Sequence, residues 1–326
     1  LGNGYILGLK NQIRLHSTSI EMDIRDMPSI RSNIIRFFMR RTLKNHEPLG
    51  INDIRQSLDL NSRRFKNAEG VHIKPTVAGA SPAEWLIPEG EHANAAVLYL
   101  HGGAYVSGSL ESHRSLASNI AKSSNVRVLL VEYRLAPEHP YPAAIDDATK
   151  AFEWIQAKYS IPADRIIIMG DSAGGGLTLA TAMRLRDTSK PLPCSLICLS
   201  PWTDLSLSGE SIITKINKDP FFSNTDFVAQ AALDYAGSMS LESAEISPLF
   251  GSLKGLPPIF IQVGSDEILL SDSLSLANLA RDSGVDIQIK VWQDMWHVWQ
   301  CFGNWMPESR DAISELGYVI QKHLSK

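Results

Sequence analysis

Apolar and polar residues alternate along the chain in a pattern that predicts short strands separated by helices. Runs of β-branched and aliphatic residues, typical of buried strands, occupy residues 95–100, 126–133, 166–169, 195–199, 259–263 and 286–292. Apolar residues at three- and four-residue spacing predict helices over residues 112–123, 143–159, 177–186, 270–282 and 308–324. Strands that alternate with helices in this way form a mostly parallel sheet with helices on both faces. We therefore predict an α/β fold.

Two segments interrupt this alternation. Residues 1–60 carry no strand signal, and their clearest element is a basic amphipathic helix predicted over residues 30–44. Residues 205–246 look mostly helical. We expect both segments to lie over the functional site. For the basic helix, packing over the domain as a lid is the favoured interpretation, and lying on a membrane surface is the alternative.

The most informative stretch is residues 166–178, in which a strand pattern is followed at once by a helix pattern. Ser172 lies between them, with Gly170 and Gly174 two positions away on each side. So tight a turn exposes the serine hydroxyl, and the glycines allow the strand and the helix to pass closely. An exposed hydroxyl is what a nucleophile needs. A phosphate-binding loop is not favoured, because no lysine follows the glycines and the G-x-G-x-x-G spacing is absent.

A serine nucleophile needs a base, which is usually histidine. In parallel sheets the catalytic groups lie at the carboxyl ends of the strands, so the base should follow a strand. His297 follows the strand predicted over residues 286–292 across a short turn. His323, the other histidine after Ser172, lies in the last predicted helix. His297 is therefore the predicted base.

The acid that orients the base should also follow a strand. Asp266 follows the strand predicted over residues 259–263 and is the predicted acid. Glu267 and Asp272 are alternatives, although we expect Asp272 to face solvent in the next helix. Serine, acid and histidine in this chain order are typical of a triad built on this turn.

A glycine-containing loop, His101-Gly102-Gly103-Ala104, follows the strand predicted over residues 95–100. A tetrahedral intermediate needs backbone N–H donors aimed at its oxyanion, and glycines leave such donors unobstructed. Ala173, directly after the nucleophile, would supply a further N–H donor.

The composition adds mainly exclusions. A chain of 326 residues with 44% hydrophobic and 20% charged residues is typical of a soluble globular protein. Its net charge of -4 gives no reason to expect a nucleic-acid partner. No run is long enough for stable membrane insertion, and residues 1–20 lack the features of a signal peptide. Three cysteines form neither a disulfide framework nor a metal cluster. The expectation is a cytoplasmic protein without a metal.

Taken together, the motifs resemble those of the bacterial hormone-sensitive-lipase-like (family IV) esterases of the α/β-hydrolase superfamily. The resemblance runs from about Val71 to the C-terminus and is carried by His101-Gly102-Gly103, residues 133–140 (Tyr-Arg-Leu-Ala-Pro-Glu-His-Pro), residues 170–175, Asp266 and His297. It implies an eight-stranded, mostly parallel sheet with a helical cap, and hydrolysis of carboxylic esters without a cofactor. It also implies an oxyanion hole made by Gly102, Gly103 and Ala173, with His101 as a structural residue.

The resemblance divides the chain into cap and core. Residues 1–60 would form the first part of the cap, residues 61–204 the first part of the core, residues 205–246 the cap insertion and residues 247–326 the rest of the core. Two positions depart from the family pattern. Ala104 replaces a third glycine, and Glu267 follows Asp266 where the family usually has proline.

We therefore predict an esterase for small-molecule esters of short-to-medium acyl chains, with Ser172, Asp266 and His297 as its triad. The side chains expected to line the substrate pocket, with core packing as the alternative, are Tyr105, Trp202, Phe221 and Phe222. A lactonase or amidase would use the same residues. A non-catalytic binding protein, similar to the plant gibberellin receptors that lack the histidine, is the other alternative, and the presence of His297 favours an enzyme. Analogy with dimeric family members allows a homodimer.

Overall fold

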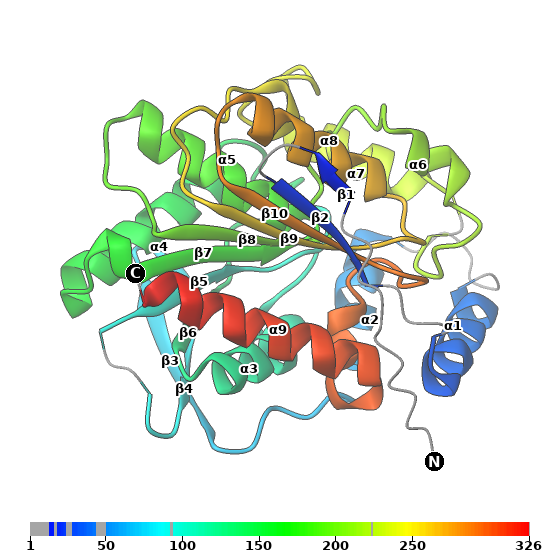
Figure 1. The fold of residues 1–326 in the computed structure, drawn as a ribbon, viewed down its shortest axis with the longest axis horizontal. Coiled ribbons are helices and arrows are strands. Elements are labelled where there is room, and N and C mark those ends of the chain that lie inside the picture. The colour runs from blue at the N-terminus through cyan, green and yellow to red at the C-terminus, as the bar shows by residue number, and fades with distance from the viewer. Residues whose placement is uncertain are drawn as a thin grey trace, which may run out of the picture.

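A ten-stranded sheet runs through the molecule, in the order β1-β2-β10-β9-β8-β7-β5-β6-β4-β3 (Figure 1). The computed structural model describes residues 13–15, 18–23, 28–43, 50–91, 94–222 and 224–325. The strands are β1 Ile13–Leu15, β2 Thr18–Asp23, β3 Val71–Ala78, β4 Ser81–Pro88, β5 Ala96–Leu100, β6 Arg127–Val131, β7 Ile166–Asp171, β8 Ser195–Leu199, β9 Ile259–Gly264 and β10 Ile287–Trp292. Pairing is parallel from β2 to β6 and antiparallel at the β1–β2, β6–β4 and β4–β3 junctions.

Helices cover both faces of this sheet. The helices in the described ranges are α1 Ile30–Leu43, α2 Ile51–Ser62, α3 Leu110–Ser124, α4 Ala143–Tyr159, α5 Ala173–Asp187, α6 Glu210–Thr214, α7 Asp226–Ala236, α8 Leu270–Asp282 and α9 Pro307–Leu324, with short 3₁₀ turns at Ala163–Arg165, Pro248–Phe250 and Trp299–Trp305. Residues of α3 and α9 pack in the core on one face, and residues of α4, α5 and α8 pack on the other. Along β5, Leu98 and Leu100 belong to one core, whereas Val97 and Tyr99 belong to the other. Because both faces are covered at the centre of the sheet, strands such as β5 and β8 are buried along their whole length, which is why their apolar runs are visible in the sequence.

The structure confirms most of the predicted strands and helices. Strands β3 to β10 form the predicted eight-stranded, mostly parallel sheet. The predicted strand over 195–199 and the predicted helices over 143–159 and 270–282 have the bounds observed for β8, α4 and α8. The helix predicted over 177–186 begins earlier, at Ala173, so the glycines after Ser172 belong to it.

Two predictions about the remaining segments were wrong. Residues 1–60 contain β1 and β2, and β2 pairs with the edge of β10. This pairing joins distant parts of the chain, so no local sequence pattern predicts it. Residues 205–246 are only partly helical, with α6 and α7 separated by turns. The Asp204 side chain, which accepts hydrogen bonds from the N–H groups of Ser206 and Ser208, holds one such turn.

The helices α1, α2 and α6 lie on the same side of the molecule, beyond one end of the strands (Figure 1). The guanidinium of Arg40 on α1 donates to the carbonyls of Asn217 and Lys218, just after α6. These contacts support the assignment of residues 1–60 and 205–246 to a cap, which stays a prediction. None of the helices within the described ranges is both long and apolar enough to cross a bilayer.

Candidate active site

Ser172 occupies the turn between β7 and α5, as the glycine spacing predicted. Its backbone has φ 53° and ψ -121°, which is strained for a residue with a side chain. The Ser172 N–H donates to the Leu199 carbonyl at 2.8 Å. A Cβ atom added to Gly170 would overlap the Gly174 carbonyl, and one added to Gly174 would overlap the Leu100 carbonyl. Only glycine therefore allows β5, β7 and α5 to pack this closely around the serine.

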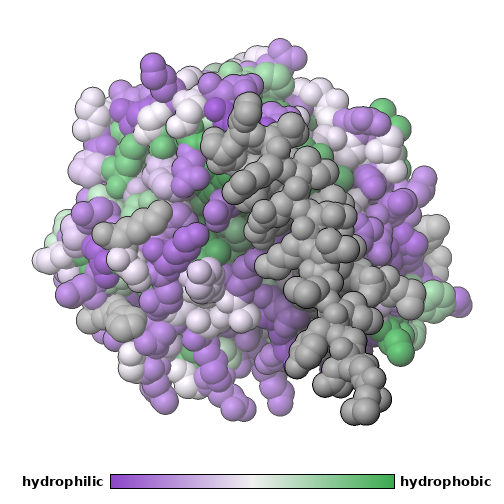
Figure 2. Space-filling view, viewed as in Figure 1, coloured by the Kyte–Doolittle hydropathy of each residue, from purple (hydrophilic) through white to green (hydrophobic). Residues whose placement is uncertain are grey.

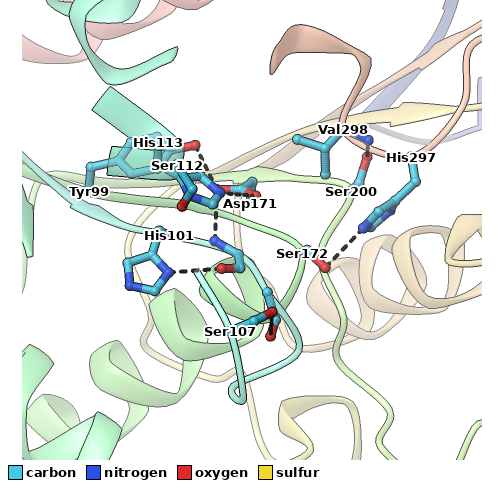
Figure 3. A network of polar contacts seen from close by, with 12 residues as sticks. Tyr99, His101, Ser107, Ser112, His113, Asp171, Ser172, Ser200, His297 and Val298 are labelled. Carbon is cyan, nitrogen blue, oxygen red and sulfur yellow. Dashed lines mark hydrogen bonds and ion pairs between the residues drawn. The ribbon is translucent and has the colours of Figure 1, made fainter. Parts of the chain in front are cut away.

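His297 lies beside Ser172, in the turn that follows β10. The distance from His297 Nε2 to Ser172 Oγ is 2.9 Å, and the two side chains point toward each other (Figure 3). This is the arrangement in which an imidazole can accept the serine proton. The pairing agrees with the prediction from the sequence.

The carboxylate that faces His297 belongs to Glu267 and not to Asp266. Glu267 Oε1 lies 3.4 Å from His297 Nδ1. The Asp266 carboxylate instead accepts from Arg36 Nη1 at 2.8 Å, with the ammonium groups of Lys215 and Lys218 also within 4.0 Å. The prediction that Asp266 orients the base is thus corrected in favour of the neighbouring acid, because adjacent residues of this turn point in different directions.

Further hydrogen bonds hold the Glu267 side chain in place. Its Oε2 atom accepts from the Gly264 N–H at 2.7 Å and from the Ser200 hydroxyl at 2.8 Å. Ser200 Oγ also accepts from the Val298 N–H at 3.2 Å (Figure 3). One serine therefore joins the acid to the residue after His297. Ser200 did not emerge as a site residue from the sequence. Its position directly after the buried strand β8 was the available signal.

The turns that carry the acid and the histidine are also joined through their backbones. The N–H groups of Ser265 and Asp266 donate to the carbonyls of Trp292 and Met295, both at 2.9 Å. A Cβ atom on Gly264 would overlap the Met295 carbonyl. The two turns therefore form one rigid unit, which keeps Glu267 and His297 in register.

The loop after β5 carries the candidate oxyanion donors, and one of the predicted donors is already engaged. The Gly102 N–H donates to Asp171 Oδ1 at 3.1 Å, so it is not available to a substrate. For the N–H groups of Gly103 and Ala104, no acceptor lies within hydrogen-bonding distance among the described residues. The N–H of Ala173 is the first of α5 and has no intrahelical acceptor. The geometry thus replaces Gly102 with Ala104 in the donor set.

Ala104 adopts φ 54°, a left-handed conformation that glycine tolerates better than alanine. The preceding Gly103 has φ 122°, and a Cβ atom there would overlap the Ser107 carbonyl. The Gly103 carbonyl accepts from the Val106 and Ser107 N–H groups and from the Ser107 hydroxyl, which closes the loop.

A buried carboxylate, Asp171, supports this loop from behind. Asp171 Oδ1 accepts from the Tyr99 hydroxyl at 2.8 Å as well as from Gly102, and Asp171 Oδ2 lies 3.3 Å from His113 Nε2 (Figure 3). Burial opposes ionisation of Asp171, but the nearby His113 and the hydrogen bonds lower its pKa overall. The ionised carboxylate therefore anchors the Gly102 peptide.

His101 has a structural position, as the resemblance implied. Its Nδ1 atom lies 2.8 Å from the Gly102 carbonyl, and its ring stacks on Tyr133 with the ring centres 4.3 Å apart. Burial lowers the pKa of His101 to about 3, so the ring is neutral near neutral pH.

The four predicted pocket residues fall into two groups. The rings of Phe221 and Phe222 lie 6.3 Å and 5.4 Å from the His297 ring, centre to centre, so both flank the base. Tyr105 and Trp202 are almost fully buried. Tyr105 stacks on Tyr235 at 3.7 Å, which makes it a core residue beneath the site. The alternative of core packing therefore describes Tyr105 and Trp202.

Two further buried acids lie near the site. Asp219 accepts from the N–H groups of Phe221 at 3.1 Å and Ile268 at 3.3 Å, and thereby connects the segment of residues 205–246 to the turn with Glu267. Burial raises the pKa of Asp219 to about 7. Asp272, which we expected to face solvent, is buried and accepts from the N–H groups of Thr203 and Asp204. The helical pattern could not reveal that this side of α8 faces another loop.

The charges around His297 favour its protonated form. Burial works to lower its pKa, but the hydrogen bond and charge of Glu267, together with the charges of Asp219 and Asp171, raise the pKa above the usual value of 6.5.

In the described part of the chain, no group of three or more histidine, cysteine or acidic residues has a metal-binding arrangement. Cys194, Cys198 and Cys301 are free thiols.

Comparisons with known proteins agree with this arrangement. A family model described as "alpha/beta hydrolase fold" matches residues 97–301. The chain is 38% identical to an acetyl-hydrolase of Streptomyces hygroscopicus over 74% of its own length and 80% of the relative's. It is 35% identical to an esterase of Acinetobacter venetianus over 85% and 92% of the two lengths.

Solved structures show the same likeness. One crystal structure, of an esterase from the bacterial hormone-sensitive lipase family, is 36% identical with a TM-score of 0.87, over 91% of this chain and 99% of that one. Another, of EstE5 soaked with p-nitrophenyl butyrate, is 34% identical with a TM-score of 0.86, over 91% of this chain and 100% of that one.

Proposed function

Because the chain belongs to the α/β-hydrolase family, and within it to the bacterial hormone-sensitive-lipase esterases, we propose that it hydrolyses carboxylic esters of short-to-medium acyl chains through Ser172, His297 and Glu267. The observation that carries the proposal is the continuous contact from the Ser172 hydroxyl through both nitrogens of His297 to the Glu267 carboxylate. This contact lies at the carboxyl ends of parallel strands, where the fold places its chemistry.

In the first half of the reaction, His297 Nε2 accepts the Ser172 proton while Oγ attacks the ester carbonyl carbon. The oxyanion that forms accepts hydrogen bonds from the N–H groups of Gly103, Ala104 and Ala173. Glu267 accepts the Nδ1–H of His297 and stabilises the imidazolium. Collapse of the intermediate breaks the bond to the alcohol oxygen, which takes the proton from Nε2.

In the second half, water attacks the acyl-enzyme and His297 accepts one of its protons. Collapse of the second tetrahedral intermediate releases the carboxylic acid and returns the proton to Ser172. Phe221 and Phe222, next to the base, would contact the apolar part of the substrate.

The proposal is tested with p-nitrophenyl esters from acetyl to palmitoyl, comparing the wild type with Ser172→Ala. We expect turnover to be fastest for acetyl to hexanoyl esters and to fall at least about a thousandfold in Ser172→Ala. Ser238→Ala, at an exposed serine of the cap insertion, is the matched control and should retain wild-type turnover.

Other outcomes would change the assignment. A long-chain optimum would contradict the proposed acyl range. Absence of ester turnover in folded wild-type protein would favour a binding protein, and faster turnover of lactones or amides would favour those substrates. A cytoplasmic location and a homodimer stay predictions from the sequence.

A further inference from the structure

The helix α1 has two faces that differ in their contacts. Its inner face carries the partly buried Ile35 and Met39, which pack against an aromatic cluster that includes Trp296 and Trp299. Between them, Arg36 lies over the Trp296 ring and binds the Asp266 carboxylate. This side of α1 is therefore fixed to the rim of the candidate active site.

The outer face of α1 exposes large apolar side chains. Ile30 is 80% exposed, Ile34 49%, and Phe37 and Phe38 61% each. Their spacing of four, three and one residues places them on one side of the helix. In Figure 2, hydrophobic atoms lie at the right edge of the molecule where Figure 1 shows α1, next to hydrophilic atoms. Several large apolar side chains on one exposed helix indicate an interaction surface.

The charge of α1 identifies the kind of partner. The helix contains four arginines and no acidic residue, although the whole chain has a net charge of -4. Arg36 and Arg40 are turned to the inner face, where they bind Asp266 and the carbonyls near α6. Arg31 and Arg41 are exposed beside the apolar side chains. The outer face is therefore both apolar and positively charged.

We propose that the outer face of α1 binds the surface of a membrane that contains anionic lipids. Phe37 and the isoleucines would enter the boundary between headgroups and acyl chains, while Arg31 and Arg41 would bind lipid phosphates. Apolar burial combined with a positive charge is the combination that holds an amphipathic helix in the plane of such a surface. The inner-face contacts keep the helix folded on the domain during binding.

A second copy of the chain fits this face less well. A symmetric contact through the outer faces of two α1 helices would bring Arg31 and Arg41 of both copies together, and the helix offers no acidic residue to pair with them. An anionic lipid surface offers acyl chains to the apolar side chains and phosphates to the arginines. Membrane binding of this kind does not depend on the proposed ester hydrolysis.

Co-sedimentation of the full chain with vesicles tests the proposal. The vesicles contain phosphatidylcholine alone or an equal mixture of phosphatidylcholine and phosphatidylglycerol. We expect binding to the anionic vesicles, weakening as salt is added. Phe37→Asp, and the double variant Arg31→Glu with Arg41→Glu, should each weaken binding by about tenfold or more.

Two exposed residues of α9, remote in sequence from α1, provide matched controls. Tyr318→Asp changes an aromatic residue that is 68% exposed, and Arg310→Glu changes an exposed arginine. Both should bind the vesicles as the wild type does. Turnover of p-nitrophenyl acetate should be the same in all variants, which shows that the site remains folded.

Three results would overturn the proposal. One is no difference between the two vesicle types, and another is equal loss of binding in the α9 controls. The third is a dimer, detected by light scattering, that Phe37→Asp dissociates, because this would assign the outer face to a second copy. If ester turnover were absent while vesicle binding followed the expected pattern, the proposed function alone would fail.

Discussion

Asp266 and Glu267 are neighbours in the chain, yet their carboxylates have different surroundings. Asp266 lies among Arg36, Lys215 and Lys218 at the rim, whereas Glu267 is fully buried between Ser200, Gly264 and His297. At this scale a single turn of the backbone decides which carboxylate can stabilise an imidazolium. The extra methylene of glutamate also lengthens its reach toward the histidine.

This difference predicts opposite results for two conservative variants. Glu267→Gln should lower kcat by about a hundred- to ten-thousand-fold, because the imidazolium loses its charged partner. Asp266→Asn should leave kcat within about threefold of the wild type, since it weakens only the rim contacts with Arg36, Lys215 and Lys218. The measurement is turnover of p-nitrophenyl butyrate across about pH 5–9.

The pH profile provides a second readout of the same variants. The base must be neutral, and its pKa is raised, so kcat/KM of the wild type should rise with pH through a midpoint above about 6.5. In Glu267→Gln the residual activity should have a lower midpoint, because the charge that raises the pKa is gone. A large loss in Asp266→Asn with little change in Glu267→Gln would restore Asp266 as the acid.

At the scale of elements, the junction of β5, β7 and α5 determines the nucleophile geometry. The strand β7 ends at Asp171 and α5 begins at Ala173, so Ser172 alone makes the turn between them, with φ 53° and ψ -121°. The beginning of α5 lies against the end of β5, where the Leu100 and His101 carbonyls are located. The close packing of α5 against β5 and β7 therefore also produces the turn that exposes the Ser172 hydroxyl.

Gly174→Ala tests this junction. The new Cβ atom would overlap backbone oxygens of Leu100 and His101, which cannot move without separating β5 from α5. We expect the free energy of unfolding to fall by about 1–3 kcal/mol or more, and kcat/KM to fall with it. Urea unfolding and p-nitrophenyl butyrate turnover measure the two effects.

Gly50→Ala is the matched control. Among the described residues, a Cβ atom at Gly50 would meet only the Asp53 side chain at 3.4 Å, an ordinary contact. Similar stability and activity in the two alanine variants would show that the close approach at Gly174 is not required.

At the scale of the whole molecule, a buried ionisable group joins two segments that are far apart in the chain. Asp272 on α8 accepts from the backbone of Thr203 and Asp204, beyond β8, and thereby joins a helix to a loop on the same side of the sheet. Burial raises its pKa from 3.8 to about 7. Between these two values the folded protein binds a proton that the unfolded chain does not. The contribution of Asp272 to stability is therefore present at low pH and is lost as the pH rises to about 7.

Asp272→Asn, which cannot ionise but keeps an acceptor oxygen, should remove this dependence. Relative to that of the wild type, the free energy of unfolding of Asp272→Asn should therefore be higher at about pH 8 than at about pH 5, by roughly 1–4 kcal/mol. Urea unfolding at the two pH values measures the difference. Asp282→Asn, at an exposed aspartate of α8, reports the effect of the changed net charge. An equal effect of Asp272→Asn at both pH values would contradict the burial of a carboxyl that is protonated near neutrality.

The sequence by itself determined the strands β5 to β10 and the helices α3, α4, α5, α8 and α9 between and after them, because strands buried on both faces are continuous apolar runs and their helices repeat every three or four residues. It also determined the pairing of Ser172 with His297. The glycines at the turn and the place of the histidine after a strand are local features, and in a parallel sheet both features place their side chains at the same edge. Phe221 and Phe222 could be singled out in the same way, as aromatic residues in the interrupting segment.

Only the tertiary structure decided between neighbours that local patterns treat alike. It turned Glu267 rather than Asp266 to the histidine, engaged the Gly102 N–H with Asp171, and buried Asp272 against a loop distant in sequence. It also added β2 to the edge of β10. Each outcome depends on a partner far along the chain, and the direction of a side chain or N–H in a turn depends on backbone angles that residue type does not specify.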